Sequence, residues 1–294
     1  MTIRRRRRVA SNVCAGCVTI LAVATQAPAN PGSPDSAPHP AGPAVVAHRG
    51  ASRELPEHTL AAYTAAVRHG ADALECDVRL TADGHLVCVH DRRIDRTSSG
   101  RGLVSTLELS QLEDLDWGSW KATDAADADP VERSRLLTLR RLLGFVAGLD
   151  RRVELAIETT HPTRYGGLVE RALADLLAEF GWAGAGSPVR VMSFSVLALR
   201  RMSQLAPQLP LVFLIDRMPY PFRDGRLPKG VGAAGISVEL LRSDPGYVRR
   251  AQAAGHAVHV WTVDEPDDVQ RCLDAGVQAI ITNHPAQVLR QLGR

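Results

Sequence analysis

The feature that most constrains the fold is a regular alternation, from residue 44 onward, of short strand-like runs with longer helical runs. This order is typical of an α/β domain built on a parallel sheet. A glycine follows several of the helical runs, as expected of a C-terminal helix cap. The runs that predict strands are Val45–Ala47, Ala73–Val78, Leu86–His90, Val153–Ile157, Val189–Phe194, Leu211–Ile215, Gly235–Val238, Ala257–Val263 and Ala279–Thr282. Those that predict helices are Leu60–His69, Gly167–Phe180, Val196–Leu205, Pro245–Ala254, Asp267–Ala275 and Pro285–Leu292.

The connection between the second and third of these strands is too short to hold a helix. A parallel crossover needs roughly a dozen residues, whereas this segment contains Asp83-Gly84, a strong hairpin signal. We therefore expect Leu86–His90 to pair antiparallel with the preceding strand. The eight strands that remain within residues 44–294 predict a (β/α)₈ barrel of the TIM type, which is typically about 250 residues long. A doubly wound sheet is the alternative.

The expected hairpin also predicts which side chains share a face. A two-residue turn at positions 83–84 places Asp77 opposite His90. Glu75, two residues before Asp77, lies on the same face of its strand. In this register Cys88 joins that face and Cys76 points away, so two carboxylates and an imidazole converge.

Polar or aromatic residues end several other strands of the predicted sheet. His48 and Arg49 follow the first strand, Glu158 follows the fourth, and Phe194 ends the fifth. In a (β/α)₈ barrel the C-terminal ends of the strands line the active site. One polar residue at a strand end is ordinary, but a set of them converging from several strands indicates a functional site.

The residue types in this set favour chemistry at a phosphodiester. Three carboxylates, Glu75, Asp77 and Glu158, would repel one another unless a cation lay between them. Oxygen ligands alone suit one hard divalent cation, either Mg²⁺ or Ca²⁺. Two histidines can remove and deliver a proton near neutral pH, and Arg49 offers a planar fork for phosphate oxygens.

Short motifs spread over residues 44–294 carry a family resemblance. They are His48-Arg49-Gly50-Ala51, Pro56-Glu57-His58-Thr59, Glu75-Cys76-Asp77-Val78, Thr81-Ala82-Asp83-Gly84, His90-Asp91, Asp95-Arg96-Thr97, Leu115-Asp116-Trp117-Gly118, Ile157-Glu158, Ser193-Phe194, Trp261 and Thr282-Asn283-His284-Pro285. In combination they closely resemble the glycerophosphodiester phosphodiesterase family.

This resemblance implies a (β/α)₈ barrel with an inserted segment after the hairpin, at about residues 92–140. It also implies cation-dependent cleavage of deacylated phospholipids to glycerol 3-phosphate and an alcohol, in which a neighbouring glycerol hydroxyl attacks phosphorus and water opens the cyclic phosphate. The roles that it implies are an acid/base pair of His48 and His90, metal ligands Glu75, Asp77 and Glu158, a phosphate contact from Arg49, and apolar substrate walls from Phe194 and Trp261.

Two positions depart from the family pattern. His58 stands where the family usually has asparagine, and Thr160 stands where many members carry a lysine that contacts phosphate. We keep Thr160 as a substrate-binding position, with Arg164 and His161 as candidates to replace the missing cation. Each charge-assisted hydrogen bond lost there is worth about 1.5–3 kcal/mol.

Two other functions stay open at this point. The first is a non-catalytic binder of phosphorylated head groups, which the departure at Thr160 motivates. The second is an enzyme acting on intact lysophospholipids or sphingolipids, with lysophospholipase D-like or sphingomyelinase D-like activity, which predicts an apolar rim around the barrel mouth. The first of these functions has a small-molecule ligand, and the second has a lipid substrate.

Residues 1–43 differ in composition from the rest of the chain. Five arginines, an apolar run and small residues follow in the order of a secretory signal peptide, and a proline-rich linker then leads to the domain at 44–294. We therefore expect export, with a cytoplasmic location as the alternative.

Residues 44–294 hold 30 basic and 31 acidic residues, so no nucleic-acid partner is expected. No apolar run approaches the ~20 residues that span a bilayer. Buried free thiols are expected at Cys76, Cys88 and Cys272.

Overall fold

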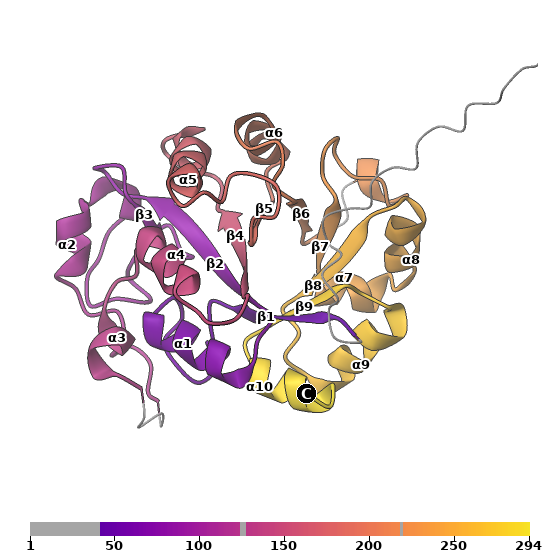
Figure 1. Ribbon diagram of the computed structural model, residues 1–294, viewed down its shortest axis with the longest axis horizontal. Coiled ribbons are helices and arrows are strands. Elements are labelled where there is room, and N and C mark those ends of the chain that lie inside the picture. Colours follow the sequence, from indigo (N-terminus) through magenta and orange to yellow (C-terminus); the bar gives the residue numbers. More distant parts are fainter. Residues whose placement is uncertain (1–41, 124–127, 218–219) are drawn as a thin grey trace, which may run out of the picture. The chain divides into compact units, whose positions relative to one another are not determined.

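The computed structural model describes residues 42–123, 128–217 and 220–294, and within them eight parallel strands close into a barrel (Figure 1). The strands follow the order β1-β9-β8-β7-β6-β5-β4-β2, and a further pairing of β1 with β2 closes the ring. The predicted TIM-type barrel is thereby confirmed. The barrel strands are β1 Ala44–His48, β2 Ala73–Leu80, β4 Glu154–Thr159, β5 Val189–Ser193, β6 Leu211–Ile215, β7 Ala233–Ser237, β8 Ala257–Trp261 and β9 Ala279–Thr282.

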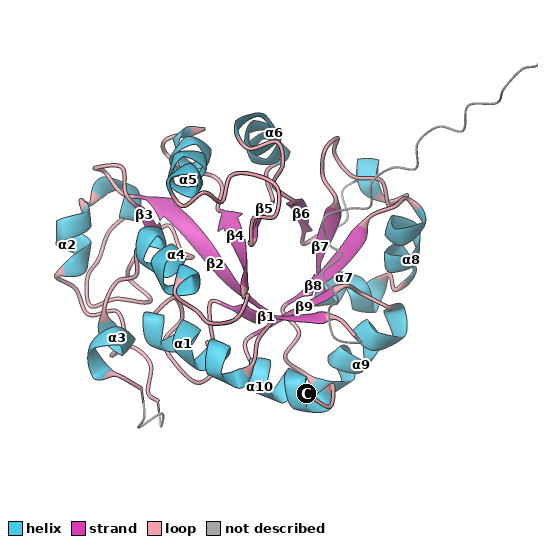
Figure 2. Ribbon diagram, in the orientation of Figure 1, coloured by secondary structure: helices cyan, strands magenta, loops and turns pink. Residues whose placement is uncertain are grey.

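Helices surround the strands on the outside (Figure 2). Glycines in the left-handed conformation end α1 at Gly70 and α9 at Gly276, as the sequence predicts. The helices that follow the barrel strands are α1 Leu60–His69, α5 Leu168–Glu179, α6 Val196–Leu205, α7 Val238–Ser243, α8 Gly246–Ala253, α9 Pro266–Ala275 and α10 Pro285–Gln291, together with the short 3₁₀ helix η2 Tyr220–Phe222. The first and last of these helices, α1 and α10, lie side by side (Figure 1).

Two hydrophobic clusters lie on opposite faces of the barrel wall. The larger one fills the layer between the strands and the helices. The smaller one fills the inside of the barrel and contains Val46, Ala73, Ala156, Met192, Val212, Leu214, Ala233, Ala279 and Ile281. Because side chains alternate along a strand, residues two or four positions beyond these face the same interior. This places the residues that end the strands at the mouth of the barrel.

The short strand β3 (Leu86–Cys88) pairs antiparallel with β2 in a register that differs from the predicted one. The partners are Val78 with Cys88 and Leu80 with Leu86. The amide of Thr81 donates to the carbonyl of His85 over 2.9 Å, so the turn holds three residues rather than two. The predicted pairing of Asp77 with His90 is therefore wrong, because the backbone opposite Asp77 is that of Val89.

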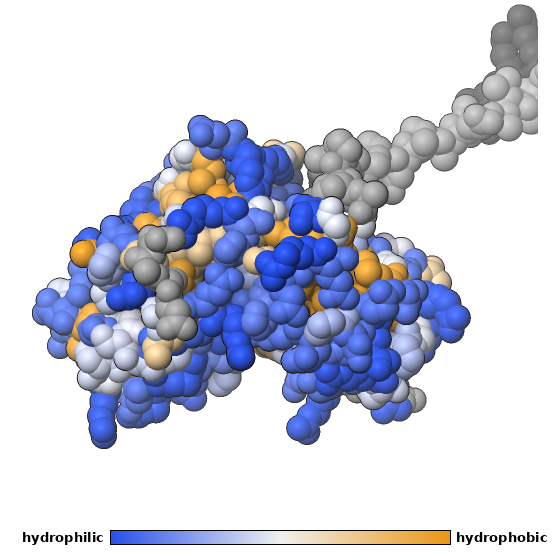
Figure 3. Space-filling view, turned by 90° about the horizontal axis from the view of Figure 1, so that it is seen from below, coloured by the Kyte–Doolittle hydropathy of each residue, from blue (hydrophilic) through white to orange (hydrophobic). Residues whose placement is uncertain are grey.

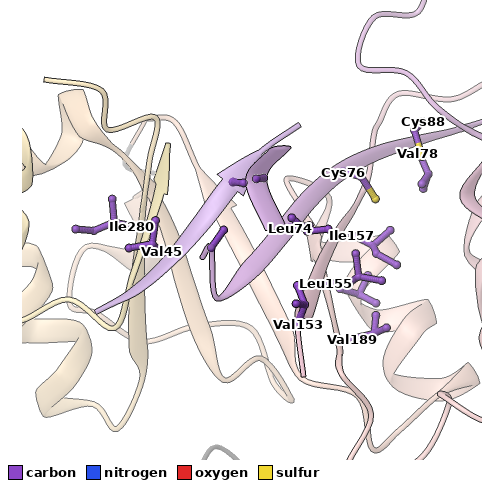
Figure 4. Packing of buried hydrophobic residues seen from close by; sticks show 14 of the residues in the cluster. Val45, Leu74, Cys76, Val78, Cys88, Val153, Leu155, Ile157, Val189 and Ile280 are labelled. Atoms are coloured by element: carbon purple, nitrogen blue, oxygen red, sulfur yellow. The ribbon is translucent and has the colours of Figure 1, made fainter. Parts of the chain in front are cut away.

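This shift of one residue also reverses the predicted face of Cys88, whereas Cys76 points away from Glu75 and Asp77 as predicted. Cys76 and Cys88 both belong to the outer cluster, with Val78 between them on the same face (Figure 4). The prediction that Cys88 joins Glu75 and Asp77 on the inner face is wrong. Cys76, Cys88 and Cys272 are nevertheless free and buried, as expected.

The segment between β3 and β4 forms a small subdomain of its own. Its helices are η1 Val104–Thr106, α2 Leu109–Glu113, α3 Pro130–Ser134 and α4 Leu139–Ala147. They enclose a third cluster built from Val87, Val89, Ile94, Val104, Leu112, Trp117 and Leu136. The segment thus packs against the face of the β3 chain that carries Val87 and Val89, opposite to Cys88.

The leader and linker predicted at 1–43 lie almost wholly outside the described residues, so the domain boundary at residue 44 and the export signal stay predictions. Among the described residues, no helix is long and apolar enough to cross a membrane. The face seen in Figure 3 is largely hydrophilic, with separate apolar patches.

Candidate active site

The three predicted metal ligands lie together on neighbouring strands at the barrel mouth. The register pairs Asp77 of β2 with Glu158 of β4, and Glu75 of β2 with His48 of β1. One carboxylate oxygen from each acid lies within 4.8 Å of the others. Burial and the charge of Asp77 raise the pKa of both Glu75 and Glu158. Such a set of buried oxygens, short of positive charge, fits a hard divalent cation.

Asp77 is the most strongly held of the three acids. Its Oδ2 accepts a hydrogen bond of 3.0 Å from His58 Nε2 and lies 3.0 Å from Arg49 Nε. Burial alone would raise the pKa of Asp77, but the His58 bond and the Arg49 charge hold it well below its usual range. Nδ1 of His58 lies 2.8 Å from the hydroxyl of Tyr63, so the imidazole is fixed at both nitrogens. The residue that departs from the family pattern at position 58 thus orients a predicted metal ligand.

A sharp turn after β1 aims Arg49 into the site. Arg49 has a φ of 57°, and the next residue, Gly50, has a φ of 87°. A Cβ at Gly50 would lie 2.7 Å from the backbone of Ala62, so this position needs glycine. The guanidinium of Arg49 binds Glu57 through Nη1 at 3.0 Å, in addition to Asp77. Its Nη2 atom has no partner among the described residues and remains for a ligand.

His48 is held by a chain of hydrogen bonds that sets its tautomer. Asp264 Oδ2 accepts from the side-chain nitrogen of Asn283 at 2.6 Å, which turns the amide oxygen of Asn283 toward His48. Because that oxygen can only accept, Nδ1 of His48 donates to it over 2.8 Å. Nε2 of His48 is left as an acceptor, 4.0 Å from Glu75 Oε2. Burial and the charge of Arg49 lower the pKa of His48 to about 4.

His90 lies beyond the end of β3 and is more exposed than His48. Its Nδ1 donates to Asp91 over 2.7 Å. Its backbone carbonyl accepts two hydrogen bonds from Arg79 of β2, at 2.8 Å from Nε and 2.5 Å from Nη2. Arg79 lies two residues beyond Asp77 and faces the same side. The hairpin therefore brings His90 to the site through its backbone, in spite of the changed register.

The two predicted aromatic walls meet at the mouth. Phe194, just after β5, and Trp261, at the end of β8, lie with ring centroids 5.5 Å apart in an edge-to-face arrangement. The indole nitrogen of Trp261 donates to the carbonyl of Gly235 over 2.9 Å, which orients the ring. Their role toward a substrate stays a prediction.

Thr160 and the two residues suggested to replace the missing lysine, His161 and Arg164, all contact other parts of the protein. The hydroxyl of Thr160 donates to the carbonyl of Val78 over 2.9 Å, which engages its only proton. His161 is bound to the buried Glu170 at 2.5 Å, and Arg164 lies over the ring of Tyr165. Of the two suggested substitutes for the lysine, His161 is thus committed elsewhere.

Sequence reasoning assigned no role to three residues that support the site: Asn283, Arg96 and Arg79. The first two stand in motifs that carry the family resemblance, so their presence there was the available signal. Arg79 has no such signal beyond its spacing from Glu75 and Asp77, because only the sheet shows that it reaches His90.

Comparison with known proteins decides the family. The family model described as "Glycerophosphoryl diester phosphodiesterase family" matches residues 48–287. The chain is also 49% identical over 249 residues to the "Probable glycerophosphodiester phosphodiesterase 1" of Mycobacterium tuberculosis, covering 83% of this chain and 90% of that protein. The chain belongs to this family. The chain is also 32% identical over 247 residues to the "Glycerophosphodiester phosphodiesterase" of Bacillus subtilis. The match covers 82% of this chain and 83% of that protein.

Solved structures of glycerophosphoryl diester phosphodiesterases and related enzymes share the barrel. A phosphodiesterase of Oleispira antarctica, solved in complex with the product sn-glycerol 3-phosphate, aligns with a TM-score of 0.74 and 25% identity, covering 86% of this chain and 97% of its own. A glycerophosphodiester phosphodiesterase of Agrobacterium tumefaciens aligns with a TM-score of 0.68 and 25% identity. The alignment covers 84% of this chain and 99% of the other chain.

Proposed function

We propose that this protein is a divalent-cation-dependent hydrolase that cleaves glycerophosphodiesters to glycerol 3-phosphate and an alcohol. The observation that carries the proposal is the cluster of Glu75, Asp77 and Glu158, whose oxygens lie within 4.8 Å of one another beside His48. The names of its relatives and the product complex of the Oleispira antarctica enzyme support the same substrate class.

His48 is suited to act as the general base. Its Nδ1 proton is engaged by Asn283, and its lowered pKa keeps Nε2 unprotonated at neutral pH. A general base needs a free lone pair within reach of the hydroxyl that attacks phosphorus. In this role Nε2 takes the proton from the glycerol hydroxyl as it attacks, and later returns a proton when the cyclic phosphate is opened by water.

His90 is suited to act as the general acid. Asp91 accepts from its Nδ1 and orients the ring, so that a proton on Nε2 can pass to the oxygen of the departing alcohol. Arg49 Nη2 is the donor left for a phosphate oxygen. A divalent cation held by Glu75, Asp77 and Glu158 would polarise the phosphoryl group and offset the charge that gathers on it.

The decisive experiment is hydrolysis of glycerophosphocholine with Mg²⁺, with Ca²⁺ and with EDTA. We expect turnover with a divalent ion and none with EDTA. His48→Ala and His90→Ala should each abolish turnover and keep the melting temperature near that of the wild type. Binding without turnover under every metal condition would favour the non-catalytic binder, and near-normal kcat in either variant would overturn the acid/base assignment.

Glu158→Gln tests the ligand set directly. The amide keeps the size of the side chain but removes one negative charge, so a higher metal concentration should be needed for half-maximal activity. Asp175→Asn, on the outer helix α5, is the matched control. An unchanged metal titration in Glu158→Gln would remove this residue from the ligand set.

A second candidate function has one observation in its favour. Phe194, Val196 and Leu197, at and after the end of β5, are 43%, 38% and 62% exposed. An apolar rim at the mouth would suit a lysophospholipid presented in a micelle. The test is release of choline from lysophosphatidylcholine micelles and from glycerophosphocholine. A Leu197→Gln variant that loses only the micellar activity, with Val131→Gln as control, would favour the lipid substrate.

We also propose that the protein is exported, on the composition of residues 1–43 alone. Mass spectrometry of the N-terminus of the protein made in a bacterial cell with an export pathway tests this. A chain that keeps residues 1–20 would contradict it.

A further inference from the structure

Four exposed apolar side chains gather at the mouth end of two neighbouring helices. Of the seven large hydrophobic residues that are exposed in the described part of the chain, four lie at or just before the start of α5 or α6. They are Leu168 of α5, Phe194 after β5, and Val196 and Leu197 of α6, and the two leucines are 51% and 62% exposed. Each helix follows a barrel strand, so its start lies at the mouth. A single exposed apolar residue is ordinary, whereas such a group indicates an interaction surface.

The starts of α5 and α6 lie next to each other. The two helices pack side by side (Figure 1). A Cβ at Gly167, just before α5, would lie 3.0 Å from the side chain of Arg201 in α6. Leu197 lies four residues before Arg201, on the same face of α6. The face of α6 that carries Leu197 is therefore turned toward the start of α5, where Leu168 lies.

Arginines follow these apolar residues at the distance of about one helical turn. Arg171 lies three residues after Leu168, and Arg200 lies three residues after Leu197, so each shares a helix face with the leucine before it. Three residues along a helix correspond to about 4.5 Å. A third arginine, Arg164, lies in the loop before α5, and all three arginines are exposed. The surface thus has apolar side chains nearest the mouth and guanidinium groups behind them.

These three arginines have no acidic partner within ion-pair distance in the described part of the chain. Residues 193–205 contain no acid, and residues 160–174 contain only Glu170. Glu170 is fully buried, is bound by His161 and lies 3.6 Å from Arg201. This end of the two helices therefore carries uncompensated positive charge, although residues 44–294 as a whole are close to neutral.

Apolar tips backed by arginines match the boundary of an anionic bilayer. Apolar side chains of proteins that lie on a membrane enter the boundary between headgroups and acyl chains to a depth of about 5–10 Å. Arginines one turn behind them would lie at the level of the lipid phosphates, which a guanidinium binds through two parallel hydrogen bonds. A second copy of this chain fits less well, because a two-fold interface would bring the surface against itself and its arginines against one another.

We propose that this surface docks on an anionic phospholipid bilayer, with the barrel mouth turned toward the lipid. We call it the docking surface, and its residues are Leu168, Val196, Leu197, Arg164, Arg171 and Arg200. Phe194 joins the docking surface to the aromatic wall that it forms with Trp261. The proposal does not depend on the proposed function, because binding to a bilayer is measured without a metal ion and without a substrate.

The experiment measures binding of the full chain to vesicles in EDTA by co-sedimentation. Vesicles of equal parts phosphatidylglycerol and phosphatidylcholine are compared with vesicles of phosphatidylcholine alone. We expect the wild type to bind the anionic vesicles at least tenfold more tightly, and less so at high salt. Arg171→Gln/Arg200→Gln should weaken binding to the anionic vesicles about 25-fold, which is about fivefold for each arginine. Leu168→Gln/Leu197→Gln should weaken it at least tenfold, because the apolar contact with the lipid is lost.

Matched controls remove the same kinds of side chain from other parts of the surface. Arg68→Gln/Arg290→Gln removes two exposed arginines from the last turns of α1 and α10, at the opposite end of the barrel. Val131→Gln/Leu205→Gln removes two exposed apolar side chains from α3 and from the last residue of α6. The arginine run at residues 4–8 is present in every protein compared, so the difference between a variant and its control reports on the docking surface alone.

Thermal unfolding shows whether each variant is folded, and Arg200→Gln and Leu197→Gln alone replace a double variant that is not. Weaker binding of both docking-surface variants than of their controls supports the proposal. Equal binding of either variant and its control overturns it, as does equal binding of the wild type to the two kinds of vesicle. A wild type that binds no vesicle but dimerises, with dimerisation lost in Leu168→Gln/Leu197→Gln, also overturns it and assigns the surface to a second copy of the chain.

Discussion

The guanidinium of Arg96 holds the carboxylate of Glu57 through two parallel hydrogen bonds, of 2.9 Å from Nη1 to Oε2 and 2.8 Å from Nη2 to Oε1. The third nitrogen of Arg96 donates to Asp91 over 2.6 Å. Glu57 in turn binds Arg49, and Asp91 binds His90. Burial alone would raise the pKa of Glu57, but Arg96 and Arg49 lower it to about 2. Arg96, on the inserted segment, thus links Arg49, the predicted phosphate contact, to His90, the proposed general acid.

Arg96→Lys should lower kcat about 10- to 100-fold, in the range seen when a residue that supports a catalytic group is lost. A lysine ammonium cannot bridge Glu57 and Asp91 with the planar fork of a guanidinium. The measurement is steady-state hydrolysis of glycerophosphocholine, with Arg93→Lys as control because the side chain of Arg93 pairs with the exposed Asp95. Equal kcat in the two variants would show that the link has no part in activity.

Asn283→Ala should reduce kcat about 100-fold and leave the metal concentration for half-maximal activity nearly unchanged. The variant removes the acceptor that fixes the Nδ1 proton of His48, so both tautomers become available and the base is misplaced. Gln287→Ala is a matched control, because the side chain of Gln287 donates to the backbone carbonyl of Asp264 over 3.4 Å. A large shift in metal activation, with kcat unchanged, would instead place Asn283 among the residues that support the cation.

His58→Ala should weaken Mg²⁺ or Ca²⁺ binding about tenfold or more, because Asp77 loses a buried hydrogen bond that orients it. His58→Asn should change it only a few-fold, since an amide can also donate to Asp77 and asparagine tolerates the φ of 60° found here. Calorimetric titration with the metal ion alone gives the comparison, and thermal unfolding checks the fold. Wild-type affinity in a folded His58→Ala protein would contradict the positioning role.

The free energy of unfolding should decrease as the pH is lowered, because His259 is buried in its neutral form. This residue faces the barrel interior in the middle of β8, where its Nε2 lies 3.3 Å from Nη1 of Arg190, and burial together with that charge lowers its pKa from 6.5 to about 3. The unfolded chain therefore binds the proton more tightly, so the contribution is complete above pH 6.5 and is lost as the pH falls toward 3.

Urea unfolding measures this effect as a difference between variants. Between pH 7 and pH 5 the wild type should lose about 2 kcal/mol more stability than His259→Gln. His85→Gln, at an exposed position, should behave as the wild type does. The same pH dependence in His259→Gln and the wild type would show that His259 is not neutral in the folded protein.

Much of the barrel could be predicted from local patterns. The helices Leu60–His69 and Val196–Leu205 and the strands Leu211–Ile215 and Ala279–Thr282 have the predicted bounds, because their capping residues and apolar runs act within a few residues. The convergence of Glu75, Asp77 and Glu158 followed from their places at the ends of parallel strands. The hairpin register did not follow, because the length of its turn depends on a hydrogen bond between Thr81 and His85 that the Asp83-Gly84 dipeptide does not specify.

The sequence by itself determined that eight parallel strands would present acids, imidazoles and an arginine at one end of a barrel, since periodicity and strand direction are local properties of the chain. Only the tertiary structure decided which partners these side chains have: Asn283 for His48, His58 for Asp77, and Arg79 for the backbone of His90. These contacts join residues up to 235 positions apart, and their geometry depends on how strands and loops pack, which no local pattern encodes.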